Sequence, residues 1–300
     1  MAPIVEHFMR FLPIFTLIVM IMAPFSAFGA ESTPVSLAKA GKWEMNYDVD
    51  SCHLVATFGA GDGEITIRMT RVGPSDSFDL TLYGKPLATD VLQRDVEIAF
   101  GAQQGFLKRS ALAGSAQIPR KVPLLMISNL RVDGKDYPAK DEPANADITP
   151  EQEAAINSIN LKLSSRRHYR LETGPLGAVF RAMRQCTTDL VKSWGFDPDV
   201  QAKLTKFAEP TGTPERWFTP NDYPSGALQN GQSGSLIFRL DVNETGKVDG
   251  CRVLYRTNPD EFATLTCKLL LRRATMSPAL DSQNRPVRSF YIRKIKWLAG

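Results

Sequence analysis

The sequence predicts an α+β protein in two parts, a β-rich N-terminal domain with helices at its end (40–207) and a small β-β-α-β domain (223–300). Apolar and polar residues alternate in short runs over 42–110, which is typical of antiparallel strands with one buried face. Segment 174–195 instead has apolar residues at helical spacing. Three prolines in 208–222 interrupt all periodicity, so we place a linker and the domain boundary there.

The first thirty residues, 1–30, are expected to be a signal peptide. After Arg10, twenty residues carry no charge, FLPIFTLIVMIMAPFSAFGA, and they end in a stretch of mostly small residues at 27–30. A basic residue, an apolar run and small residues in this order are typical of secretory signals. Twenty apolar residues can also span a bilayer, so membrane anchoring through residues 11–30 is the alternative. We therefore expect a periplasmic protein, held at the inner membrane if the segment is not cleaved.

The charge of the chain is concentrated at its C-terminal end. The formal net charge is +4 at pH 7, and residues 251–300 contain ten Lys and Arg against three Asp and Glu. An exported chain rarely meets nucleic acid, so we expect no nucleic-acid partner. Anionic lipid, peptidoglycan or an acidic protein surface suits this charge better. A solvated face without a partner is the alternative.

The four cysteines are expected to form two disulfides, because the compartment of an exported chain is oxidising. Four cysteines allow three connectivities. Cys186 lies on the apolar face of the 174–195 helix and Cys52 stands at the head of a strand, so the preferred pairing is Cys52–Cys186. We expect neither a metal nor a cofactor, because no CxxC and no His pair is present; outside the first thirty residues only His53 and His168 occur.

The C-terminal pattern places the other two cysteines together. GSLIFRLDV and VDGCRVLYR form a hairpin around the turn NETGK, with Cys251, Val253 and Tyr255 on one face of its second strand. The following helix has Cys267 on its apolar side, so both cysteines face the space between helix and sheet. A Cys251–Cys267 disulfide closes a loop of about fifteen residues and contributes roughly 3 kcal/mol in the chain-entropy model.

Several short motifs follow one another in this region: Tyr-Pro and Gly before the first strand, Gly in the turn, Pro-Ala after the helix, and a closing aromatic strand, VRSFYIRKIKW. In this order and spacing, residues 223–297 resemble the C-terminal domain of the TonB energy-transducer family. The cysteine pair is similar to that of one branch of the family. The matching positions are Tyr223, Pro224, Ala227, Gly234, Gly246, Val248, Pro278 and Ala279.

The resemblance implies a non-enzymatic, protein-binding role in the cell envelope, in or beside TonB-dependent transmembrane transport. Such domains bind outer-membrane receptors, or another envelope protein, which add a strand to the exposed edge of the sheet. By analogy the last strand, Ser289–Trp297, is the docking edge, and the partner-binding residues are Arg288, Phe290, Tyr291, Arg293, Lys294 and Lys296. The basic side chains are equally typical of edge strands that avoid aggregation. Where transducers carry a Pro-rich spacer, this chain has the region 40–207, which resembles no family that we can assign.

We expect no enzymatic activity, because the candidate catalytic motifs are incomplete. GQSGS (231–235) is similar to a serine-protease nucleophile loop, but no His occurs in that domain. DVNETG begins with the spacing of a calcium loop, but Arg252 stands where a bidentate Glu is needed. The alternative is a secreted hydrolase with its site in the N-terminal domain, for which His53 and His168 are the candidates.

Overall fold

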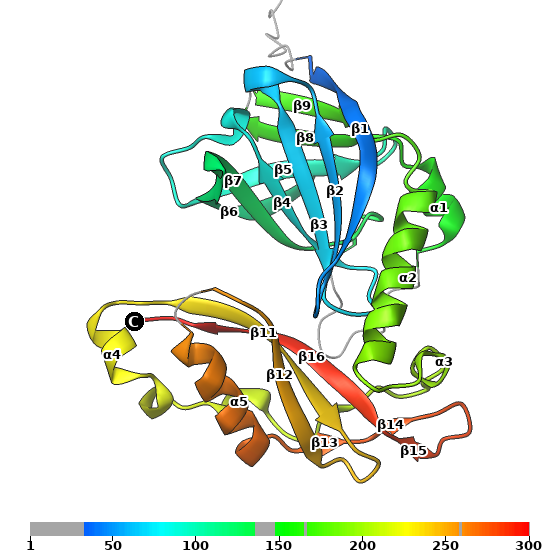
Figure 1. Ribbon diagram of the computed structural model, residues 1–300, viewed down its shortest axis with the longest axis vertical. Helices are drawn as coiled ribbons and strands as arrows, with labels where there is room; N and C mark the ends of the chain where they lie inside the picture. Colours follow the sequence, from blue (N-terminus) through cyan, green and yellow to red (C-terminus); the bar gives the residue numbers. More distant parts are fainter. Residues whose placement is uncertain (1–32, 136–147, 165–166, 258–259, 300) are drawn as a thin grey trace, which may run out of the picture. The chain divides into compact units, whose positions relative to one another are not determined.

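The computed structural model describes residues 33–135, 148–164, 167–257 and 260–299. The segment expected to be a signal peptide or anchor, 1–30, lies outside the described residues. The described chain is mixed α+β with mostly strands, as predicted, and consists of a nine-stranded barrel followed by a smaller sheet with its own helix (Figure 1). Among the helices in the described ranges, none is both long enough and apolar enough to cross a membrane.

The barrel strands follow the order β1-β2-β3-β4-β7-β6-β5-β8-β9 (Figure 1). Neighbouring strands are antiparallel except β1 and β9, which pair in parallel and close the barrel. The strands are β1 Val35–Tyr47, β2 Cys52–Phe58, β3 Ile65–Arg71, β4 Phe78–Tyr83, β5 Gln93–Phe100, β6 Leu107–Ile118, β7 Arg120–Leu130, β8 Ile159–Ser164 and β9 Arg167–Glu172.

Alternation along the strands fills the barrel with apolar side chains. In β2, for example, Cys52, Leu54, Ala56 and Phe58 are buried and the residues between them are partly exposed. The inward side chains of the other strands join them in one continuous apolar cluster. The strands predicted within 42–110 are therefore confirmed. Closure into a barrel was not predicted, because it depends on the pairing of β1 with β9, far apart in the sequence.

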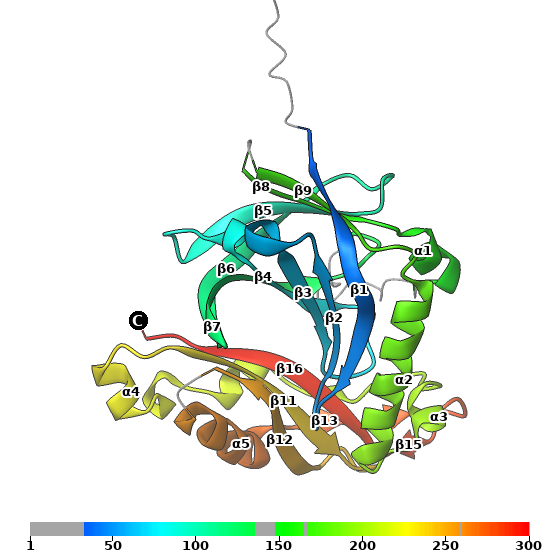
Figure 2. The same ribbon diagram turned by 45° about the horizontal axis from the view of Figure 1, so that its top comes forward.

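Two helices accompany the barrel, α1 (Pro150–Ala155) between β7 and β8 in the chain and α2 (Gly177–Ser193) after β9. Thr149 begins α1 with a reciprocal capping box to Gln152. Gly195 follows α2 with a φ of +84°, the left-handed conformation in which helices commonly end. Figures 1 and 2 show α2 beside β1 and β2. Its buried face contributes Phe180, whose ring lies 5.9 Å from that of Phe78 in the barrel core.

Both predicted disulfides are present. Cys52 of β2 bonds to Cys186 of α2, and both side chains are fully buried. Cys251 bonds to Cys267 in the C-terminal part. Each disulfide therefore joins a helix to a strand.

The C-terminal part, residues 204–299, contains a three-stranded antiparallel sheet in the order β12-β11-β16, with α5 packed on one face (Figure 2). Short elements connect the three strands and α5. The bounds, with those of the preceding helix α3, are α3 Pro198–Gln201, β10 Glu209–Pro210, α4 Ser225–Gln229, β11 Gly234–Val242, β12 Val248–Arg256, α5 Glu261–Arg273, β13 Met276–Ser277, β14 Ala279–Leu280, β15 Pro286–Val287 and β16 Ser289–Trp297.

An aromatic cluster forms the centre of this part. Trp297, at the end of β16, stacks on Phe262 of α5 with ring centroids 5.4 Å apart, and Tyr223 meets both rings edge-on. The Trp297 indole N–H donates a hydrogen bond to Thr266 Oγ1 at 3.0 Å. Because an aromatic ring buries a large apolar area, these contacts fix the last strand and the helix to each other. They also give Tyr223, one of the family-like positions, a structural role.

Two details of the C-terminal part differ from the sequence expectation. The stretch 208–222, expected to be a linker, contributes Ala208 and Trp217 to the apolar core, and β10 within it pairs with β13. In β12, a β-bulge after Val253 moves Tyr255 into register with Ile237, so that Tyr255 no longer shares a face with Cys251. The one-residue shift of a bulge cannot be read from alternation alone.

Asp222 is expected to make the C-terminal part sensitive to acid. Its carboxylate accepts hydrogen bonds from Arg273 at 2.5 and 3.0 Å and from Thr219, and these hold the pKa of Asp222 well below its usual range. A lowered folded-state pKa contributes stability that is present above the unfolded pKa of about 3.9 and is lost as the pH falls through the folded value. Asp222→Asn should therefore destabilise the protein most at pH 7, and its effect should shrink steadily as the pH falls below about 4, as measured by urea unfolding from pH 7 to pH 2. An unchanged pH profile would contradict this assignment.

Candidate partner-binding edge

The strand β16 is one edge of the C-terminal sheet (Figure 2). It pairs with β11 along its whole length, from Ser289 opposite Val242 to Trp297 opposite Gly234. In the described part of the chain no strand pairs with its other side. Its outward N–H and C=O groups are therefore available for a further strand.

One face of β16 contacts the helical end of the barrel region and the barrel itself. The Phe290 ring meets Trp194 and Phe196 edge-on, with centroids 5.4 and 5.2 Å away. Lys294 Nζ donates to Ser128 Oγ at 3.0 Å and lies 3.6 Å from Asp79 Oδ2. Two of the residues expected to bind a partner, Phe290 and Lys294, thus already make contacts within the chain.

The remaining candidate residues are differently placed. Tyr291 is half-buried and contacts Phe238 and Trp217. Arg293 is exposed and donates from Nε to the Tyr291 hydroxyl at 2.8 Å, and Lys296 is also exposed. Arg288 lies over the Phe196 ring, 4.8 Å from its centroid, and within 3.4 Å of a carboxylate oxygen of Asp249. Of the six, Arg293 and Lys296 are the charged side chains most open to a partner.

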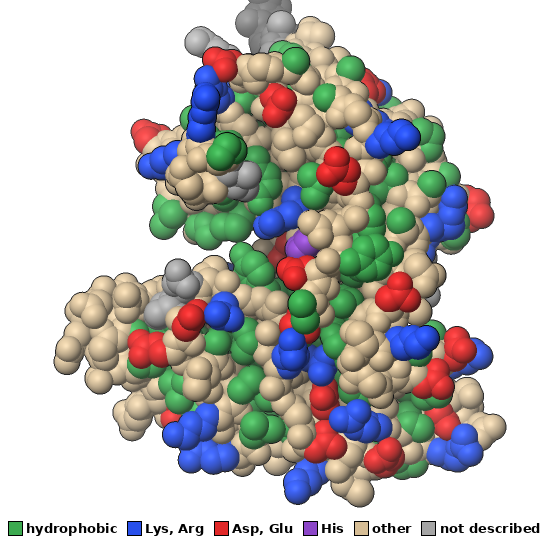
Figure 3. All heavy atoms as spheres, in the orientation of Figure 1, with side chains coloured by type: hydrophobic (Ala, Val, Ile, Leu, Met, Phe, Trp, Pro, Cys, Tyr) green, Lys and Arg blue, Asp and Glu red, His purple; other side chains and the backbone are tan. Residues whose placement is uncertain are grey.

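Ion pairs compensate much of the basic C-terminal end. Figure 3 shows Lys and Arg side chains interspersed with Asp and Glu over the C-terminal part. Six of the ten basic residues in 251–300 lie within 4 Å of a carboxylate, some of them from distant parts of the sequence. The pairs are Arg252–Asp50, Arg256–Asp260, Arg273–Asp222, Arg285–Asp281, Arg288 with Asp241 and Asp249, and Lys294–Asp79.

A cleft of about 700 Å³ follows β16 from Ser289 to Lys294. We call it the β16 cleft. Its other sides come from the loop between β3 and β4 (72–77), from Asn129 at the end of β7, and from the segment between α3 and β10 that includes Leu204 and Phe207. The candidate edge therefore opens into a bounded space rather than onto a flat surface.

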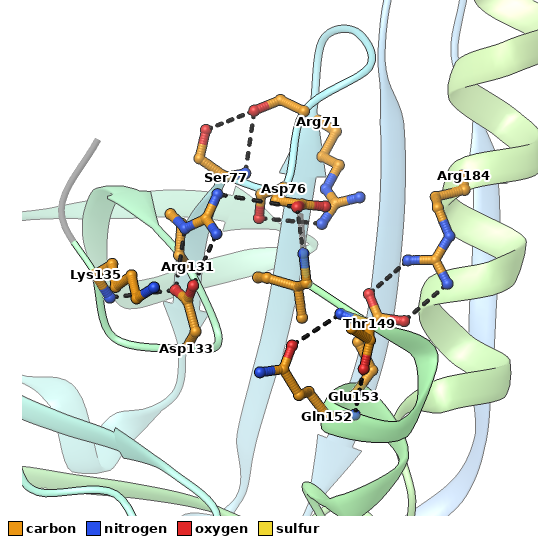
Figure 4. Close-up of polar contacts among 12 residues, drawn as sticks. Arg71, Asp76, Ser77, Arg131, Asp133, Lys135, Thr149, Gln152, Glu153 and Arg184 are labelled. Atoms are coloured by element: carbon orange, nitrogen blue, oxygen red, sulfur yellow. Dashed lines mark hydrogen bonds and ion pairs between the residues drawn. The ribbon is translucent and has the colours of Figure 1, made fainter. Parts of the chain in front are cut away.

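A polar network holds the β3–β4 loop in place (Figure 4). The Asp76 carboxylate accepts a hydrogen bond from the backbone N–H of Ile148 at 2.8 Å, and Arg131 lies 3.9 Å from it. Arg71 donates to the backbone carbonyl of Asp76 at 3.2 Å. Nearby, the guanidinium of Arg184 in α2 donates hydrogen bonds to both carboxylate oxygens of Glu153 in α1, at 2.5 and 2.8 Å. Because Arg71 at the end of β3, Arg131 after β7 and Ile148 before α1 all contact Asp76, the loop conformation is fixed.

Arg71 is a deeply buried cation of this network, with 3% of its surface exposed. Burial lowers the pKa of Arg71 to about 10, and Asp76 and Glu153 oppose that shift, so the side chain remains protonated at pH 7. Its guanidinium lies over the Phe180 ring, 5.3 Å from the centroid. A cation–π contact of this kind partly replaces the lost hydration.

The two histidines considered for a hydrolase lie in different surroundings. His53 contacts Ser51 Oγ through Nε2 at 3.0 Å and Thr70 Oγ1 through Nδ1 at 2.9 Å, and Asp48 approaches the same Nε2 at 3.9 Å. A Ser-His-Asp triad instead places the hydroxyl and the carboxylate on opposite ring nitrogens. Burial, and then Arg68, lower the pKa of His53. His168 packs edge-on against Phe106.

Sequence reasoning missed the residues that face β16 across the cleft. Ser75, Ser77 and Asn129 lie in loops at the end of the barrel, and Phe207 precedes the stretch taken as a linker. Serine and asparagine in a loop are ordinary turn residues, so their types carried no signal. Nor did Phe207 carry one, because its exposure of 68% is visible only in the structure and single exposed apolar residues are common.

Comparisons with known proteins bear on the C-terminal part. A search of curated proteins and a search of solved structures each gave no match. The family described as the Gram-negative bacterial TonB protein C-terminal matches residues 219–298. The resemblance predicted for residues 223–297 is thereby confirmed, and this part of the chain is similar to the C-terminal domain of a TonB-like cell-envelope protein.

Proposed function

We propose that this chain is a periplasmic protein-binding protein that captures an extended segment of an envelope protein, such as an outer-membrane receptor, by strand addition to β16. It acts in or beside TonB-dependent transport and does not catalyse a reaction. The single observation that carries the proposal is the free edge of β16 within the TonB-like part. Backbone hydrogen bonds of the added strand supply the affinity.

Three further features support this function. The match to the TonB C-terminal family covers the whole β12-β11-β16 sheet and α5. Two disulfides are typical of a protein that works in an oxidising compartment such as the periplasm. The exposed Arg293 and Lys296 allow charge selectivity in addition to backbone pairing.

The proposal predicts that the full chain binds receptor segments through the backbone of β16. Overlapping fifteen-residue peptides that tile the periplasmic segments of the outer-membrane receptors of the same bacterium serve as probes, with affinity measured by fluorescence anisotropy. Ile292→Pro and Arg293→Pro form an informative pair. Adjacent N–H groups point to opposite edges of a strand, so one proline breaks the pairing with β11 and the other alters only the free edge.

Of the two β16 variants, the one that keeps the native circular dichroism spectrum and thermal midpoint should no longer bind the peptides. A matched pair on the opposite edge strand, Arg252→Pro and Val253→Pro, supplies the control, and its folded member should bind as the unaltered chain does. Undiminished binding by the folded β16 variant, or no binding of any receptor peptide to the unaltered chain, would overturn the proposed function.

A further inference from the structure

We propose that the barrel forms the second wall of the docking site, so that the partner segment lies in the β16 cleft between β16 and the β3–β4 loop, and that this segment is acidic. The inference rests on the proposed function, since it concerns the same edge of β16. To the proposed function the inference adds two statements: which other part of the chain contacts the partner, and which charge the partner carries.

The run of residues along the cleft shows that the cleft follows the backbone edge of β16. Six consecutive residues, Ser289 to Lys294, line it. Successive side chains of a strand point to opposite faces, so six in a row indicate that the cleft follows the hydrogen-bonding edge, and Ile237 of β11 shows that it also reaches one face of the sheet. Six residues of strand span about 20 Å. A volume of about 700 Å³ is within the range of ligand sites, roughly 300–1,000 Å³.

The opposite wall lies close to β16 and is already formed. At Gly73 of the β3–β4 loop an added Cβ would stand 2.8 Å from Ile292 Cδ1, so the loop and the strand are in direct contact there. Ser75, Ser77 and Asn129 offer hydroxyl and amide groups to the cleft. Asp76 and its partners hold this loop (Figure 4), so that little conformational entropy is lost when a peptide enters.

The third side of the cleft is apolar. Leu204 and Phe207 line it, and Phe207 is 68% exposed although it lies next to the buried Ala208. An exposed aromatic ring at the border of a cleft is a suitable contact for an apolar side chain of the bound segment. A strand with alternating acidic and apolar residues therefore fits the walls.

The charges of the cleft favour an acidic segment. Its two carboxylates are already paired, Asp79 with Lys294 and Glu209 with Lys206. Arg293 also lines the cleft, and among the described residues no carboxylate lies within 4 Å of it. The buried Arg71 adds a second positive charge without an ion pair in the described ranges. Carboxylates of a partner would balance this excess of positive charge.

Two synthetic ten-residue peptides test the charge. Both carry valine at alternate positions, and the other positions are Glu in one peptide and Lys in the other. We expect the full chain to bind the acidic peptide at least tenfold more tightly than the basic one, with an advantage that falls as salt rises. Arg293→Glu should remove this preference. Equal binding of the two peptides, or no binding of the acidic peptide while receptor segments still bind, overturns the charge assignment and leaves the proposed function standing.

A matched pair of serine substitutions tests the wall. Ser75 is exposed and lines the cleft, whereas Ser115 is exposed on β6 and does not. Ser75→Trp should weaken binding of the acidic peptide at least tenfold by filling the cleft from the barrel side, and Ser115→Trp should leave it unchanged. If Ser75→Trp binds normally while the folded proline variant of β16 does not, the barrel is not a wall of the site, but strand addition remains. If the proline variant also binds normally, the proposed function itself fails.

Discussion

Arg184→Met is expected to lower the free energy of unfolding by about 3 kcal/mol, at the lower end of the cost of breaking a buried ion pair. Glu153, its partner, has 1% of its side chain exposed and receives two hydrogen bonds from the Arg184 guanidinium. Removing the cation leaves a carboxylate in a place where water cannot solvate it. Arg184 itself is 35% exposed, and this screening reduces the loss. Urea unfolding at pH 7 measures the effect.

The double variant Arg184→Met with Glu153→Met provides the control. It removes both charges and leaves apolar side chains of similar length, so it should lose less stability than Arg184→Met alone. Glu153→Gln should be milder, because the amide still accepts a hydrogen bond from Arg184. A single variant within about 0.5 kcal/mol of the unaltered chain would show that the pair contributes little to holding α1 against α2, since substitutions away from structural features typically cost no more than that.

The barrel shows which elements of the fold can be predicted from local sequence patterns and which cannot. Alternation located β2, β3 and β4 with nearly the observed bounds, because one face of each strand is buried. The closing pair of β1 and β9 joins Val35 to Tyr169, and no local pattern encodes such a distant pairing. The disulfides were predictable because a cysteine on the apolar face of a helix and a cysteine on a strand both face the core, and this limits the pairings that they can form.

The candidate site shows the corresponding limit. Sequence resemblance predicted β16 as the docking edge, but it could not show that the Phe290 ring meets those of Trp194 and Phe196. Nor could it show the loop residues across the cleft, such as Ser75, because their position depends on how the polar contacts of Asp76 fix that loop. The proposed site thus combines an edge strand, which sequence resemblance could point to, with loop residues of the barrel, which it could not.

Loss of the Cys52–Cys186 disulfide should have the largest effect on stability of any change considered, and a larger one than loss of Cys251–Cys267. The sequence separations are 134 and 16 residues. In the chain-entropy model these correspond to roughly 5 and 3 kcal/mol, because the longer loop restricts the unfolded chain more. Alanine is the suitable replacement, since serine would leave a hydroxyl at Cys52 and Cys186, which are fully buried.

The two double-alanine variants should also act on different parts of the chain. Cys52→Ala with Cys186→Ala should raise amide hydrogen exchange in β2 and α2, and Cys251→Ala with Cys267→Ala should raise it in β12 and α5. Reductant should lower the unfolding midpoint of the unaltered chain and have no effect on a variant lacking all four cysteines. If the 52/186 variant unfolds at the same urea concentration as the unaltered chain, the disulfide does not stabilise the barrel. An equal exchange response in both parts would mean that the barrel and the C-terminal part unfold as one cooperative unit.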